Sequence, residues 1–90
     1  MVKYDIYFTK QAQKDKKLIK QAGLEEKTRL LLKILIENPF QNPPPYEKLV
    51  GNLDGFLSRR INLQHRLVYK VTEESKSVKI LRMWTHYDGT

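Results

Sequence analysis

Residues 57–71 read Leu-Ser-Arg-Arg-Ile-Asn-Leu-Gln-His-Arg-Leu-Val-Tyr-Lys-Val. In its second half, apolar and aromatic side chains occupy every second position: Leu67, Tyr69 and Val71. A period of two is typical of a strand with one face in the core. A polar turn at 72–76 separates this run from a second alternating run that begins at Val78. We therefore expect antiparallel strands joined by short links, a meander, to form the C-terminal half of the fold.

Two helices are predicted before this β-rich half. Thr9 offers a hydroxyl N-cap for a helix over residues 10–22, and Gly23 fits the end of that helix. A second helix begins at Leu24 and has a wide apolar face. It ends at Asn38, because the residue before a proline is pushed out of the α region. The apolar stripe predicted for the first helix consists of Ala12, Leu18, Ile19 and Ala22.

The remaining segments complete a β-α-α-β-β-β order. Residues 1–8 alternate and predict a short strand, while residues 41–45 predict a stiff, extended connector because three prolines follow one another. Residues 46–50 form a short element whose type the pattern leaves open. The sequence thus predicts an α+β fold, two N-terminal helices packed on a small antiparallel sheet, as a single domain over residues 1–90.

Composition narrows the possible functions. The chain has 90 residues, no cysteine, and 17 Lys and Arg against 10 Asp and Glu, a formal net charge of +7. Disulfides, zinc–thiolate sites and thiol nucleophiles are therefore excluded. There is no signal-peptide pattern and no apolar stretch long enough to span a bilayer, so we expect a cytoplasmic protein without membrane contact. The charge favours a polyanionic partner.

Few residues could carry chemistry. The histidines, His65 and His86, lack helix-spaced acidic partners, so no metal site and no cofactor is expected. No glycine-rich phosphate loop is present, and a Gly-x-Ser-x-Gly nucleophile elbow is also missing. The chemistry left to consider belongs to the basic strands.

Those strands could gather cations on one side of the sheet. Side chains of matching parity on neighbouring strands share a face, and arginine clusters bind phosphate through forked hydrogen bonds. RNA carries its own nucleophile, the 2′-hydroxyl, so a base, an acid and a cation suffice to cleave it. Glu47 is a candidate base, His86 a candidate acid and Arg66 a candidate electrostatic clamp. A solvated glutamate and a structural histidine are equally ordinary, so the residues alone indicate only an anion-binding α+β domain.

Five spaced blocks in the second half of the chain resemble the Txe/YoeB family of toxins, within the RelE superfamily. They are Glu47-Lys48-Leu49, Gly51-Asn52-Leu53-Asp54-Gly55-Phe56, Ser58-Arg59-Arg60-Ile61, His65-Arg66-Leu67-Val68-Tyr69 and His86-Tyr87. The resemblance implies a RelE-like fold and a toxin of a type II toxin–antitoxin module. It also implies a ribosome-dependent mRNA endonuclease, a metal-independent mRNA interferase that leaves a 2′,3′-cyclic phosphate.

The resemblance also assigns site residues and partners. Glu47 would be the general base, Arg66 would stabilise phosphate charge, His86 would be the general acid, and Tyr87 would help to position the nucleotide. The expected RNA-binding residues are Arg59 and Arg60, which match basic residues of the family's substrate face, and Arg82, which the pattern of basic strands adds. The implied partners are an acidic YefM-like antitoxin, the ribosome with mRNA in its decoding site, a second copy of the chain, and operator DNA through the antitoxin only.

Two other functions remain open. A ParE-like relative of similar fold would act by binding a topoisomerase, and the filled positions Glu47 and His86 argue against that reading. A basic nucleic-acid-binding module without enzymatic activity would show salt-dependent binding but no cleavage products.

Overall fold

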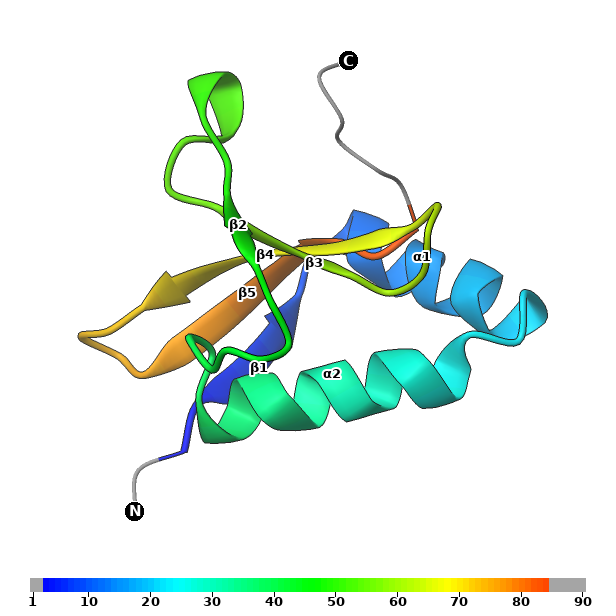
Figure 1. Cartoon of the computed structure of the whole chain (residues 1–90), viewed down its shortest axis with the longest axis horizontal. Coiled ribbons are helices and arrows are strands. Elements are labelled where there is room, and N and C mark those ends of the chain that lie inside the picture. Colours follow the sequence, from blue (N-terminus) through cyan, green and yellow to red (C-terminus); the bar gives the residue numbers. More distant parts are fainter. Residues whose placement is uncertain (1–2, 85–90) are drawn as a thin grey trace.

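In residues 3–84, the part of the chain that the computed structural model describes, two α-helices pack on a five-stranded mixed sheet (Figure 1). The elements are β1 (Asp5–Phe8), α1 (Lys10–Gln21), α2 (Glu25–Glu37), β2 (Glu47–Lys48), the 3₁₀ turn η1 (Gly51–Leu53), β3 (Leu57–Arg60), β4 (Arg66–Thr72) and β5 (Ser77–Arg82). The α+β class and the order of the elements confirm the prediction, and the open segment 46–50 contains the short strand β2.

The helix boundaries follow the local signals in the sequence. The Thr9 hydroxyl accepts a hydrogen bond from the Ala12 N–H at 3.0 Å and caps α1. Gly23 has a φ of +74°, the left-handed conformation that ends many helices and that glycine adopts without strain. Asn38 is extended before Pro39, so α2 ends at Glu37.

The sheet order is β1-β5-β4-β3-β2, which differs from the predicted all-antiparallel sheet at one pairing. β1 runs parallel to β5, while the other neighbours are antiparallel. The first and last strands within residues 3–84 thus lie side by side. Strands so far apart in sequence pair only if the segments between them bring the chain back to the same edge of the sheet. No local sequence pattern encodes that return.

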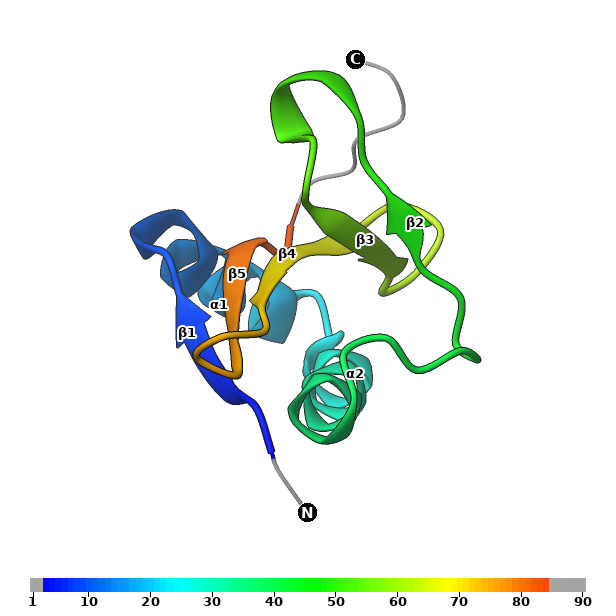
Figure 2. The ribbon, with the colours of Figure 1, turned by 90° about the vertical axis from the view of Figure 1, so that its left-hand side faces the viewer.

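The core lies between the helices and one face of the sheet, and Figure 2 shows α2 nearly end-on beneath that sheet. Its buried members are Ala12, Ile19, Leu31, Leu35, Leu57, Ile61, Leu67, Tyr69, Val78, Ile80 and Met83. Leu18, which was predicted for the buried stripe of α1, is exposed. Asp15 is buried there instead, one helical turn from both Ala12 and Ile19.

In the described part of the chain, no helix is long and apolar enough to cross a membrane.

Candidate active site

Strands β2, β3 and β4 place four polar side chains on the outer face of the sheet, the face away from the helices. Glu47 pairs with Ser58 across β2 and β3, and Arg60 pairs with Arg66 across β3 and β4. Directly paired residues share a face, and so do residues two apart on one strand. The side chains of Glu47, Ser58, Arg60 and Arg66 therefore lie together, so that two cations of the basic strands share one side of the sheet.

Glu47 and Arg66 form an ion pair. The Arg66 Nη1 lies 3.3 Å from the Glu47 Oε1. The Arg66 side chain is only 13% exposed, whereas that of Glu47 is 64% exposed. The guanidinium is thus held in place by its surroundings, and the carboxylate remains open to solvent and to a ligand. A carboxylate in this position can accept a proton while the cation beside it stabilises negative charge.

A small pocket of about 70 Å³ opens between these residues. Pro45, Glu47, Ser58, Arg60 and Arg66 line this outer-face pocket. Ligand sites for drug-sized molecules are several times larger, roughly 300–1,000 Å³. The volume and the two guanidinium groups suit one small anionic group, such as a phosphate of a longer chain.

The two arginines of this pocket face each other directly. Arg60 and Arg66 are cross-strand partners, and like charges in directly opposed positions destabilise a sheet. Glu47 offsets part of that repulsion through its ion pair with Arg66. An anion bound between the two guanidinium groups would remove the rest, so the arrangement is suited to binding an anion.

Arg59, predicted to bind RNA, lies on the opposite face and is 1% exposed. Its guanidinium donates to the Tyr69 hydroxyl at 3.0 Å and to the carbonyls of Pro39 at 3.0 Å, Gln41 at 2.7 Å and Pro44. The prediction was wrong because adjacent strand residues point to opposite faces. The connector predicted over residues 41–45 is also not extended, since residues 39–44 curl so that three carbonyls of this loop converge on the Arg59 side chain.

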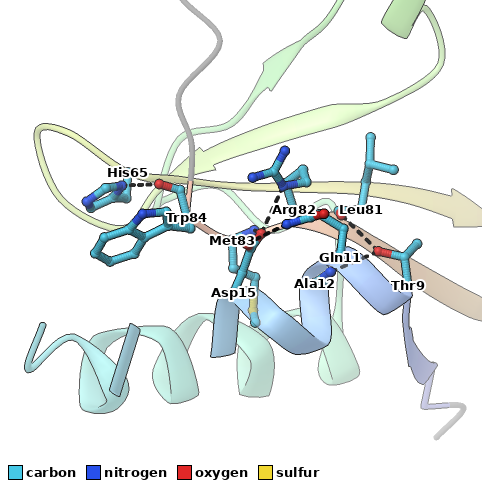
Figure 3. A network of polar contacts seen from close by, with 9 residues as sticks. All are labelled: Thr9, Gln11, Ala12, Asp15, His65, Leu81, Arg82, Met83 and Trp84. Carbon is cyan, nitrogen blue, oxygen red and sulfur yellow. Dashed lines mark hydrogen bonds and ion pairs between the residues drawn. The ribbon is translucent and has the colours of Figure 1, made fainter. Parts of the chain in front are cut away.

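Arg82, also predicted to contact RNA, forms an ion pair with the buried Asp15 of α1 (Figure 3). The Arg82 Nε and the Met83 N–H each donate to the Asp15 Oδ2 at 2.9 Å. Burial alone would raise the pKa of Asp15, but the hydrogen bonds from Arg82, Met83 and Gln11 outweigh it and lower the pKa. A contact between Arg82 and RNA remains a prediction.

Replacing Asp15 by asparagine is expected to lower the free energy of unfolding by about 2–4 kcal/mol, because the Arg82 Nε and the Met83 N–H then lose a charged acceptor in a buried site. The folded-state pKa of Asp15 is lowered, so its stabilising effect is complete above the unfolded-state pKa. That effect is lost as the pH falls below about 4 toward the folded-state pKa. Urea denaturation between pH 7 and pH 3 should therefore show the wild type and Asp15→Asn converging at low pH. A constant gap would contradict this role of the charge.

His65 fixes the chain directly after β5. Its Nδ1 is hydrogen-bonded to the Trp84 carbonyl, and its ring stacks on the Trp84 indole with centroids 3.9 Å apart (Figure 3). His65 lies directly before β4 and is buried, and its contacts in the described chain are structural. Together with the bonds to Asp15, this contact anchors residues 82–84.

The predicted residues His86 and Tyr87 lie outside the described residues. In the sequence they follow Trp84 by two and three positions, so they continue from the anchored end of the described chain. Of the predicted site residues, the structure therefore brings together Glu47, Arg60 and Arg66, and it separates Arg59 from them.

Two residues of this region were missed from sequence. Ser58 has the same strand parity as Arg60, and Asp15 occupies the helical spacing of the buried stripe. Both signals were present, but neither distinguishes a functional polar residue from an ordinary one. Within residues 3–84, no three His, Asp or Glu side chains cluster in a way that could hold a metal ion.

Comparison with known proteins confirms the resemblance to the Txe/YoeB toxins. The family model described as "YoeB-like toxin of bacterial type II toxin-antitoxin system" matches residues 4–87. The toxin YoeB of Synechocystis sp. is 39% identical over 75 residues, covering 83% of this chain and 78% of that protein. The toxin YoeB of Escherichia coli (strain K12) is 40% identical over 73 residues, covering 81% of this chain and 77% of that protein.

Solved structures agree with this assignment. YoeB in a heterotetrameric complex with YefM from Staphylococcus aureus superposes with a TM-score of 0.78 at 38% identity, covering 93% of this chain and 98% of that one. A YoeB/ParE toxin from Agrobacterium tumefaciens gives a TM-score of 0.83 at 27% identity, covering 92% and 99%. From sequence and fold together, this chain belongs to the YoeB-like toxins of bacterial type II toxin–antitoxin systems.

Proposed function

We propose that this toxin is a ribosome-dependent endonuclease that cleaves mRNA in the decoding site without a metal ion. The observation that carries the proposal is the outer-face pocket, where the exposed Glu47 carboxylate and the anchored Arg66 guanidinium meet at 3.3 Å. A proton acceptor and a cation at that separation fit the two needs of RNA cleavage at phosphate.

In the proposed reaction, Glu47 removes the proton from a ribose 2′-hydroxyl, and that oxygen attacks the adjacent phosphorus. Arg66 and Arg60 stabilise the negative charge that builds on the non-bridging oxygens. His86 donates a proton to the departing 5′-oxygen as the phosphorus–oxygen bond breaks, and Tyr87 positions the nucleotide. The products are a 2′,3′-cyclic phosphate and a free 5′-hydroxyl, and the proton gained by Glu47 balances the one lost by His86.

Primer extension on translated mRNA tests the proposal. Wild-type protein is expected to produce discrete stops on ribosome-bound transcripts, and far fewer stops on the same RNA without ribosomes. Cleavage of both RNAs at equal rates would contradict ribosome dependence. Salt-dependent RNA binding without any cleavage would instead indicate a non-enzymatic nucleic-acid-binding module.

The proposal extends to partners. The net charge of +7 favours an acidic protein when the toxin is silenced, and the Staphylococcus aureus relative has been solved with YefM and as a dimer. We propose that a YefM-like antitoxin binds this toxin and that the toxin reaches operator DNA only through the antitoxin. In the absence of the antitoxin, we propose that the toxin forms a homodimer. It acts in the cytoplasm, where translation occurs. Binding of a small acidic YefM-like protein should suppress cleavage; continued cleavage in that complex would contradict neutralisation.

A further inference from the structure

The hydroxyl of Ser58 is buried without a hydrogen-bond partner. Ser58 lies inside β3 and is 2% exposed, and its Oγ is the buried side-chain polar atom in residues 3–84 that has no partner. Leaving a buried hydroxyl unpaired costs folding free energy, and alanine would fill the same strand position without that cost. Folding stability therefore does not explain a serine at this position, which raises the question of what its hydroxyl binds.

The position of Ser58 answers this question. Ser58 is the direct cross-strand partner of Glu47, lies two residues before Arg60, and lines the outer-face pocket together with Arg66. The carboxylate of Glu47 is next to it and yet is bonded to Arg66, not to the hydroxyl. The other polar side chains that line this pocket are guanidinium donors, which offer the hydroxyl no acceptor.

We propose that the Ser58 Oγ–H binds the substrate, donating a hydrogen bond to a non-bridging oxygen of the phosphate held between Arg60 and Arg66. This inference rests on the proposed function, and it assigns to Ser58 the role of a third donor at the scissile phosphate, beside Arg60 and Arg66. A phosphate oxygen is an acceptor that fits a pocket of this size, and a charged acceptor gives a stronger bond than a neutral one. Because negative charge on these oxygens grows during attack, the bond should favour the transition state over the bound substrate.

The test compares Ser58→Ala and Ser58→Thr with Ser77→Ala. Ser77 is the matched control, because its hydroxyl bonds Ser75 near the start of β5, outside the pocket. Ser58→Ala is expected to retain or raise the melting temperature and yet to slow single-turnover cleavage of ribosome-bound mRNA by about 10–100-fold. Ser58→Thr keeps the hydroxyl and should recover most of the rate, while Ser77→Ala should cleave like the wild type.

Two results would overturn the proposal: cleavage by Ser58→Ala at the wild-type rate, or a rate that falls only in step with a lowered melting temperature. Binding of a 2′-deoxy-substituted mRNA, which lacks the nucleophile, separates this inference from the proposed function. If the wild type fails to cleave mRNA but binds the 2′-deoxy RNA more tightly than Ser58→Ala does, the endonuclease assignment is wrong and the phosphate contact is supported. Equal binding by the wild type and Ser58→Ala, together with no cleavage by either protein, would contradict both the phosphate contact and the endonuclease assignment.

Discussion

Glu47→Gln is expected to reduce the rate of mRNA cleavage by about 10²–10⁴-fold, the usual contribution of a general base. Glutamine has nearly the same shape but cannot accept the proton of the 2′-hydroxyl. Since the Glu47 side chain is largely exposed and its ion pair lies at the surface of the sheet, the variant should fold like the wild type. Single-turnover cleavage of ribosome-bound mRNA measures the rate, and circular dichroism checks the fold.

Glu73→Gln is the matched control for this experiment. Glu73 is also a surface carboxylate with a salt bridge, to Lys76, and it accepts a hydrogen bond from Tyr4, but it lies in the β4–β5 turn outside the pocket. The Glu73→Gln variant should cleave mRNA at the wild-type rate. If Glu47→Gln cleaves as fast as Glu73→Gln, Glu47 is not the base.

Arg59→Leu is expected to lower the free energy of unfolding by about 3–5 kcal/mol. The substitution removes the donor shared by three loop carbonyls and the Tyr69 hydroxyl, and it leaves these acceptors in a buried site. Tyr69 keeps its own hydrogen bond to the Pro39 carbonyl at 3.0 Å, so the loop loses part of its attachment to the sheet rather than all of it. Small domains are stable by roughly 5–15 kcal/mol, so a large fraction of the total would be lost.

Arg60→Leu is the control, one residue further along β3. Arg60 is exposed and faces another arginine, so its removal should leave the free energy of unfolding nearly unchanged while it slows cleavage. Urea denaturation and the cleavage assay should therefore separate two neighbouring arginines, one required for stability and the other for activity. Similar loss of stability in both variants would contradict the assignment of faces.

The sequence predicted the parts of the fold that depend on neighbouring residues. Thr9, Gly23 and Asn38 mark helix ends through hydroxyl capping, left-handed backbone and the proline rule, and all three were read correctly. The parallel pairing of β1 with β5 was missed, because it joins segments about seventy residues apart and has no local signature.

The candidate site, like the fold, could be predicted from the sequence only in part. The sequence predicted only that cations of the basic strands could gather on one side of the sheet, and the structure pairs Arg60 with Arg66 there. Arg59 was misplaced because the family motif was carried over as a pair, although two adjacent strand residues cannot share a face. The buried Asp15 was missed because a charged residue is buried only with a partner, and Arg82 lies sixty-seven residues away in sequence.

The adjacent arginines of β3 also leave the register of this strand ambiguous. A slip by one residue would bring Arg60 to the loop carbonyls and Arg59 to the place of Ser58 in the pocket, while Ile61 would replace Arg60 opposite Arg66. Leu57 and Ile61 are buried in the observed alignment, and such a slip would turn both toward the outer face. The placement of the outer-face pocket is thus encoded in part by two aliphatic side chains that lie outside it. Polar substitution of either should disrupt the pocket while every residue that lines it is unchanged.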